Sequence, residues 1–73
     1  MPEMTEVVSS NIAAIGWEDD KLFVTFKSKL TVPTNYSYEG VPKELFEEML
    51  IAPSVGKFFN EKIKVEYVGK REE

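Results

Sequence analysis

The sequence contains no cysteine and no histidine. Without cysteine, the chain can form neither a disulfide framework nor a thiolate metal site, which suits a reducing cytosol. The absence of histidine removes the commonest general base, and the absence of cysteine removes the strongest nucleophile. Phosphate-binding loops, dinucleotide fingerprints and calcium-loop spacings do not occur in the sequence either. These absences predict a protein that is not an enzyme and that uses no cofactor or metal.

Long apolar runs are also missing. No stretch approaches the roughly 20 apolar residues that a membrane helix needs. The opening residues, MPEMTEVV, lack both the basic flank and the apolar run of a signal peptide. With 73 residues, the chain is long enough for one small domain. We expect a single domain over residues 1–73, with a core over about residues 8–68 and frayed ends, in a monomeric cytoplasmic protein without a membrane partner.

The charge balance is acidic. Nine lysines and arginines stand against thirteen aspartates and glutamates, so the net charge is −4. An acidic chain gains little from the phosphate backbone, which disfavours general binding to nucleic acid. The distribution is uneven, however, because residues 54–64 carry Lys57, Lys62 and Lys64 against Glu61 alone. A local basic edge on an acidic protein therefore remains open.

Three segments have the composition of β-strands. Residues 11–17 (NIAAIGW) and residues 22–27 (LFVTFK) are separated by the acidic turn at 18–20 and are predicted to form a hairpin. Residues 35–39 (NYSYE) alternate polar and aromatic side chains after a loop containing Pro33, and predict a third strand. The order of these segments favours a three-stranded antiparallel meander.

Two amphipathic helices are predicted after the strands. The first follows Pro42 and stops at Ala52, because the residue before a proline avoids helical geometry. The second is capped by Ser54. Their apolar stripes hold Leu45, Phe46, Met49, Leu50, Val55, Phe58, Phe59 and Ile63. We expect an α+β fold of order β-β-β-α-α, with residues 65–68 (VEYV) as a short final strand or a packed tail.

Tyr36 and Tyr38 lie two positions apart in the third predicted strand, so both rings point to one face of the sheet. That face is either the core or an exposed platform on which nucleobases stack. Asn35, Ser37 and Glu39 occupy the other side and are polar. We therefore expect the tyrosines to face the helices and the polar side to face water.

Phe23 is the aromatic residue whose environment the sequence leaves open. If Leu22, Val24 and Phe26 face the helices, Phe23 shares the opposite face with Lys27 and is exposed there unless the C-terminal tail covers it. An exposed aromatic ring beside a lysine can stack on a base or anchor a protein partner. The structural alternative is a half-covered packing residue.

These segments together resemble the KTSC domain, a small module that occurs alone or at the C-terminus of some lysyl-tRNA synthetases. The resemblance runs from about Val8 to Lys64 and rests on VSSNIAAIGW, LFVTFK, YSY, VPKELFEEML and APSVGKFFNEKIK, in this order. Its most specific pieces are the Tyr-x-Tyr motif followed by Val41-Pro42, and the sequence SVGKFFN over residues 54–60. The resemblance implies RNA binding as one function.

One segment departs from the family pattern. Family members pass into the Tyr-x-Tyr strand through a short turn containing glycine, whereas SKLTVPTN is longer here, lacks glycine and carries Leu30 and Val32. An extended apolar loop suggests a surface for a protein partner. Alternatively, both side chains fold back over the small core. A free-standing acidic chain of this length also resembles a phage-encoded regulator that binds host RNA polymerase, inhibits transcription initiation and promotes antitermination.

We therefore expect a protein-binding transcription regulator that acts on bacterial RNA polymerase, in the cytoplasm of the bacterial host if the chain is phage-encoded. The residues assigned to this partner are Phe23, Lys27, Lys29, Leu30, Val32 and Asn35. The alternative is an RNA-binding module of the KTSC type, whose nucleic-acid contacts are Lys57, Lys62 and Lys64 with an exposed aromatic ring. A passive folding or assembly module is a third alternative.

Overall fold

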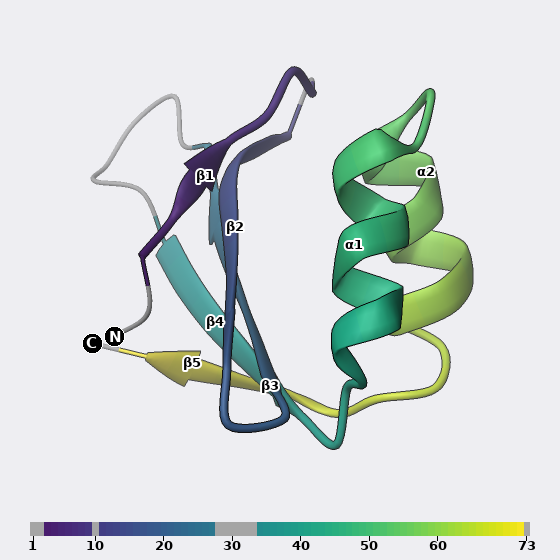
Figure 1. Ribbon diagram of the computed structural model, residues 1–73. Coiled ribbons are helices and arrows are strands. Elements are labelled where there is room, and N and C mark those ends of the chain that lie inside the picture. The colour runs from purple at the N-terminus through teal and green to yellow at the C-terminus, as the bar shows by residue number, and fades with distance from the viewer. Residues whose placement is uncertain (1–2, 10, 28–33, 73) are drawn as a thin grey trace.

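The computed structural model describes residues 3–9, 11–27 and 34–72 of the chain. An antiparallel sheet forms one layer, and a pair of helical segments lies against one of its faces (Figure 1). The strands are β1 (Thr5–Glu6), β2 (Ile12–Glu18), β3 (Lys21–Phe26), β4 (Thr34–Glu39) and β5 (Gly69–Glu72). The first helical segment is α1 (Lys43–Ile51). The second consists of α2 (Val55–Phe58) and η1 (Phe59–Ile63), a stretch of π-helix that continues α2.

The strands lie in chain order, β1-β2-β3-β4-β5, and all neighbours are antiparallel. The predicted hairpin is confirmed, because β2 and β3 are joined by a tight turn at Asp19 and Asp20. Their φ angles are 50° and 60°. Two consecutive left-handed residues match the twist of a hairpin, and aspartate tolerates this conformation better than most residues. The predicted α+β class is confirmed, and the meander extends from three strands to five.

The two additional strands lie at the edges of the sheet. β1 forms in the segment for which the sequence predicts a frayed end. β5 forms later in the chain than the strand predicted over residues 65–68. The backbone amides of Glu66 and Tyr67 both donate to the carbonyl of Ile63, at 3.2 and 2.8 Å, so the chain is still turning there. The short C-terminal strand that the sequence predicts is therefore present, but it lies at Gly69–Glu72 and not at residues 65–68, because it forms where the chain pairs with β4. Within residues 65–68, Tyr67 is partly buried against the core, as the alternative of a packed tail predicts.

Both tyrosines of the Tyr-x-Tyr motif face the helices, as strand alternation predicts. Tyr36 pairs with Val24 across the sheet, and Tyr38 pairs with Leu22. Tyr38 is 6% exposed, and Tyr36 is half-buried against the same core. The buried core consists of Ile12, Ile15, Leu22, Val24, Tyr38, Val41, Met49, Val55, Phe59 and Ile63.

The face of the sheet away from the helices is more buried than the sequence predicts. Ser37, expected to face water, is 5% exposed, and Phe23 is 8% exposed. Phe23 lies between Gly16 on β2 and Ser37 on β4. These neighbours are small, and we attribute the burial of Phe23 to the room that they leave for its ring against the sheet. Pairing with β5 gives Ser37 a strand on either side. The prediction that the side chain of Ser37 faces water is therefore wrong. Phe23 is also buried and not exposed.

Helix α1 lies where the sequence predicts it. It begins at Lys43, directly after Pro42, and stops before Ala52 and Pro53. Among its predicted core residues, Met49 is fully buried. The other three are only partly buried, and they are Leu45, Phe46 and Leu50.

The second helical segment changes its winding at Phe59. The amide of Lys64 donates to the carbonyl of Phe59, five residues earlier, at 2.9 Å, which defines a π-turn. Phe59 and Ile63 are buried, whereas Phe58, which the sequence places in the core, is half-buried. None of the helices in the described residues is long and apolar enough to cross a membrane.

Candidate functional site

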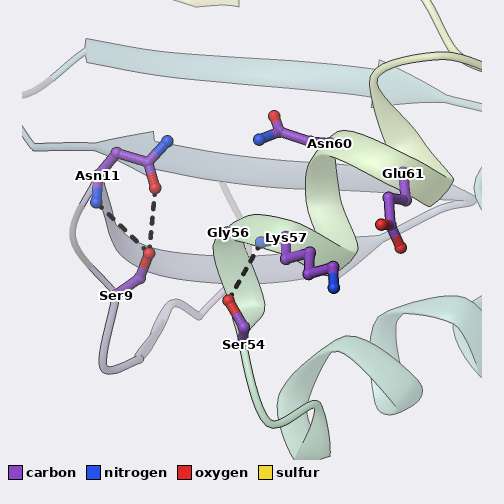
Figure 2. A pocket seen from close by; sticks show the side chains of 7 residues that line it. All are labelled: Ser9, Asn11, Ser54, Gly56, Lys57, Asn60 and Glu61. Atoms are coloured by element: carbon purple, nitrogen blue, oxygen red, sulfur yellow. Dashed lines mark hydrogen bonds between the residues drawn. The ribbon is translucent and has the colours of Figure 1, made fainter.

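An open polar cleft lies between the turn that precedes β2 and the start of the second helical segment (Figure 2). Its volume is about 550 Å³. The residues that line it are Ser9, Asn11, Ser54, Gly56, Lys57, Asn60 and Glu61. Two segments that are far apart in the sequence therefore form one hydrogen-bonding surface.

Ser9 organises the first wall of the cleft. Its Oγ accepts hydrogen bonds from the backbone amides of Asn11, at 3.4 Å, and Ile12, at 3.3 Å. The same hydroxyl donates to Oδ1 of Asn11 at 3.1 Å. Such local bonds from a serine side chain form a compact turn. They fix the carboxamide of Asn11 through its oxygen and leave its NH₂ group on the cleft side.

The second wall is the start of α2. Ser54 Oγ accepts a hydrogen bond from the backbone amide of Lys57 at 3.3 Å, which confirms the predicted helix cap. A Cβ atom on Gly56 would lie 2.9 Å from Oδ1 of Asn11 and 3.2 Å from Oγ of Ser9. Glycine at this position therefore allows the helix backbone to approach the Ser9 turn closely.

Three exposed side chains on the helical wall carry the functional groups, and they are Lys57, Asn60 and Glu61. Figure 2 shows the carboxamide of Asn60 turned toward Asn11, with Lys57 and Glu61 on the side away from Asn11. No hydrogen bond joins the side chains of these three residues to another residue drawn there. The cleft thus offers two carboxamides, one cation and one anion.

The composition of the cleft limits the ligands that it can hold. It contributes a single carboxylate, from Glu61. Across the described residues, no group of three side chains from histidine, cysteine, aspartate or glutamate could hold a metal ion. The cleft is therefore suited to ligands recognised by hydrogen bonds and by a single ion pair.

Burial raises the pKa of the Tyr38 phenol above its ordinary value of 10.0. The neighbouring phenol of Tyr36 adds to this rise, because two phenolates close together would repel one another. The shift follows from packing in the core and not from the cleft, so it bears on stability.

The residues that the sequence assigns to a protein partner are only partly accessible. Phe23 is buried and Asn35 is half-buried, where its Oδ1 accepts a hydrogen bond from Oγ1 of Thr25 at 2.6 Å. Lys27 is exposed. Three of the assigned residues lie outside the described residues, and they are Lys29, Leu30 and Val32.

Lys27 connects this assigned surface to the polar cleft. Its backbone amide donates to the carbonyl of Asn11 at 2.9 Å. Its Nζ donates to the carbonyl of Ser9 at 2.6 Å. The end of β3 is thus bonded twice to the turn that forms the first wall.

The three lysines assigned to nucleic acid lie on one helical segment, and two of them line different hollows. Lys57 lines the polar cleft, whereas Lys62 lines a separate, more apolar hollow with Leu45 and Phe58. Lys64 is exposed at the end of η1. The structure brings these cations onto one helical segment without gathering them in one groove.

Sequence reasoning missed the contribution of Ser9, Asn11, Asn60 and Glu61 to a shared cleft. A signal was present, because VSSN and SVGKFFN are two of the pieces on which the family resemblance rests. Their polar residues have no place in an apolar core. The glycine at position 56 was a further signal, since glycine in a first helical turn often marks close packing.

The fold and the cleft define a class of small α+β domains in which an antiparallel meander carries its helices on one face. The sequence model of the KTSC domain matches residues 8–67 of the chain. The chain therefore belongs to the KTSC domain family. No match was found among curated proteins. The crystal structure of a KTSC domain protein from Yersinia pestis is similar over 100% of both chains, with a TM-score of 0.87 and 28% sequence identity.

Proposed function

We propose that this KTSC protein is a non-catalytic transcription regulator that binds bacterial RNA polymerase, inhibits initiation and promotes antitermination. The proposal starts from the likeness of a small, acidic, free-standing KTSC chain to a phage-encoded regulator of this kind. Such a protein acts by occupying a polymerase surface needed at the promoter, or by favouring a polymerase conformation that cannot initiate. Both routes require binding alone and no chemistry.

The inward packing of the Tyr-x-Tyr motif favours a protein partner over RNA. Tyr38 is 6% exposed, and its ring packs against the ring of Phe59 with centroids 5.3 Å apart. Tyr36 packs in the same way against Phe26, at 5.5 Å. The ring of Tyr38 is too buried for a base to stack on it, and the ring of Tyr36 is only partly accessible. The net charge of −4 also works against phosphate binding.

The proposed contact surface centres on Lys27 and on the segment that follows it. Leu30 and Val32 belong to this surface on sequence grounds, because apolar side chains in a polar segment are typical of protein contacts. Asn35, half-buried at the start of β4, borders the surface. Phe23 has too little exposed area to contribute and is left out.

The function can be tested by measuring the affinity of the purified protein for bacterial RNA polymerase, together with promoter-dependent transcription in its presence. We expect direct binding and a loss of initiation that follows occupancy. The double variant Leu30→Asp, Val32→Asp should weaken binding, because it places two charges in an apolar contact. The matched control is Ser28→Asp, Thr31→Asp, which adds the same charge to polar positions of the same segment.

Each result bears on a different part of the proposal. Absence of binding by the unmodified protein contradicts the function. If the unmodified protein and the Leu30→Asp, Val32→Asp variant bind polymerase with equal affinity, the proposed contact surface is wrong and the proposed function stands. The circular dichroism spectrum of each variant shows whether the fold is retained.

RNA binding is the second candidate, and the exposure of Lys57, Lys62 and Lys64 on one helical segment favours it. Affinity of this kind should fall steeply as salt is added, because phosphate contacts release counterions. Titration of ¹⁵N-labelled protein with a single-stranded RNA should then shift the amides around these lysines. Glu61 stands among them and reduces the local positive charge.

A further inference from the structure

We infer that the polar cleft binds an extended peptide segment of the protein partner, with its main chain between Asn11 and Asn60 and an acidic side chain at Lys57. The inference rests on the proposed function, because it assigns the segment to the polymerase. It adds a recognition site whose residues differ from those that the sequence assigns to the partner.

The first argument is the match between carboxamides and a peptide backbone. A carboxamide carries an NH₂ donor and a carbonyl acceptor, as a peptide group carries an N–H and a C=O. Asn11 uses its oxygen in the Ser9 turn and keeps its NH₂ group for a carbonyl of the ligand. Asn60 faces it from the helical wall without a bond to the other residues drawn in Figure 2. An extended chain presents carbonyls and amides to both walls.

The second argument is charge. The cleft holds one cation, Lys57, and one anion, Glu61. A phosphate backbone would be attracted by the first and repelled by the second, so a nucleic acid gains little. A peptide places a single carboxylate beside Lys57 and keeps uncharged groups elsewhere.

The third argument is that the cleft is built on fixed elements. The hydroxyl of Ser9 holds the Asn11 wall by three hydrogen bonds, and the hydroxyl of Ser54 caps the helical wall. Gly56 allows the walls to lie close, since a Cβ atom there would come within 2.9 Å of Oδ1 of Asn11. Walls that are fixed before binding lose little conformational entropy when a ligand enters.

The cleft also adjoins the surface proposed for the polymerase. Lys27 is bonded through its backbone and through its side chain to the Asn11 wall. A partner that contacts Lys27 therefore lies next to the cleft. One polypeptide can reach both surfaces without crossing the molecule.

The test compares two cleft variants with a matched control in binding to RNA polymerase and to short peptides tiled along its subunits. Asn60→Ala should raise the Kd about tenfold, as expected for loss of a paired hydrogen bond. Lys57→Glu should raise the Kd by more than tenfold, because it opposes the acidic side chain. Lys64→Glu makes the same charge change at an exposed position that does not line the cleft, and should alter the Kd less than twofold.

Lys57→Glu is useful because it should not destabilise the fold. A glutamate three residues after the Ser54 cap completes a capping box and suits the start of a helix. Lost affinity in this variant therefore reports on the cleft. As a second readout, a binding peptide should shift the ¹⁵N amide resonances of Ser9, Asn11, Ser54 and Asn60.

The outcomes separate this inference from the proposed function. If the unmodified protein binds polymerase and both cleft variants bind equally well, the inference is overturned and the proposed function stands. If the unmodified protein does not bind polymerase, both fail. If a single-stranded RNA, and no peptide, shifts the amides of the cleft, the occupant is a nucleic acid and the inference is again overturned.

Discussion

The ring of Tyr38 on β4 packs edge-on against the ring of Phe59 at the start of η1, with centroids 5.3 Å apart and planes inclined by 76°. Phe59 makes a second edge-on contact with Phe26, at 5.4 Å, and Phe26 makes a third with Tyr36, at 5.5 Å. Four aromatic rings thus join the sheet to the helical layer. Edge-on pairs contribute beyond their buried area, so the Tyr-x-Tyr motif stabilises the fold.

Phe59→Ala should lower the free energy of unfolding by about 3–5 kcal/mol, because it removes two ring contacts and leaves a cavity. Phe59→Leu should cost clearly less, since most of the volume is retained. Urea unfolding followed by the fluorescence of Trp17 measures both changes. Val65→Ala, at a residue that is 72% exposed, is the control and should change stability by less than about 0.5 kcal/mol. If Phe59→Ala and Phe59→Leu lower the free energy of unfolding equally, the cavity is not the cause of the loss.

Alkaline pH should destabilise the protein through Tyr38. Because the pKa of this phenol is raised in the folded state, the unfolded chain loses its proton first as the pH passes 10.0. The stabilisation is complete below that pH and declines as the pH rises toward the folded-state pKa. Denaturant melts at a series of alkaline pH values should show this decline, and Tyr38→Phe should reduce it. An unchanged slope in the phenylalanine variant would assign the decline to other groups.

Loss of the helix cap should destabilise the second helical segment. Ser54→Ala removes the acceptor for the amide of Lys57 and should cost about 1 kcal/mol. Ser54→Asp keeps an acceptor at this position and should retain most of the stability. Thermal melts of the two variants provide the comparison. If both variants lose the same stability, the hydroxyl has a role other than capping.

Gly69 should not tolerate a side chain. A Cβ atom there would lie 2.6–2.8 Å from the ring and hydroxyl of Tyr38, its partner across the β4–β5 pair. Gly69→Ala should therefore cost about 1–3 kcal/mol and loosen β5, which faster amide hydrogen exchange in that strand would reveal. Gly40 is the comparison, because a Cβ there meets no atom but its φ of +79° strains any side chain. Gly40→Ala should be destabilising without loosening β5.

Much of the fold follows from local signals in the sequence. Alternation along residues 35–39 gave the orientation of the tyrosines, and a proline marked each end of α1. The edges of the sheet could not be predicted in this way. β5 is the charged segment GKRE, whose place depends on the free backbone edge of β4. The residue opposite Ser37 on this side, Lys70, could not be predicted for the same reason.

The candidate site was less accessible to sequence reasoning. Its residues come from two short segments, and their spacing in the chain gives no sign that they meet. Lys57 was singled out for its charge and Ser54 for its cap, whereas Asn11 and Asn60 stand in segments of the family resemblance without any feature that indicates a shared cleft. The distance between Gly56 and Asn11 became visible only in three dimensions.

The pairing of β5 with β4 has a consequence for self-association. β4 presents six residues, Thr34–Glu39, and two of them are tyrosines. A chain that stops after Val68 would leave this strand unpaired along one side. Bare edges of this kind recruit strands from neighbouring molecules, so such a chain should dimerise or precipitate as its concentration rises. The outer strand β5 carries a lysine and an arginine, and charged side chains of this kind disfavour edge-to-edge pairing of sheets.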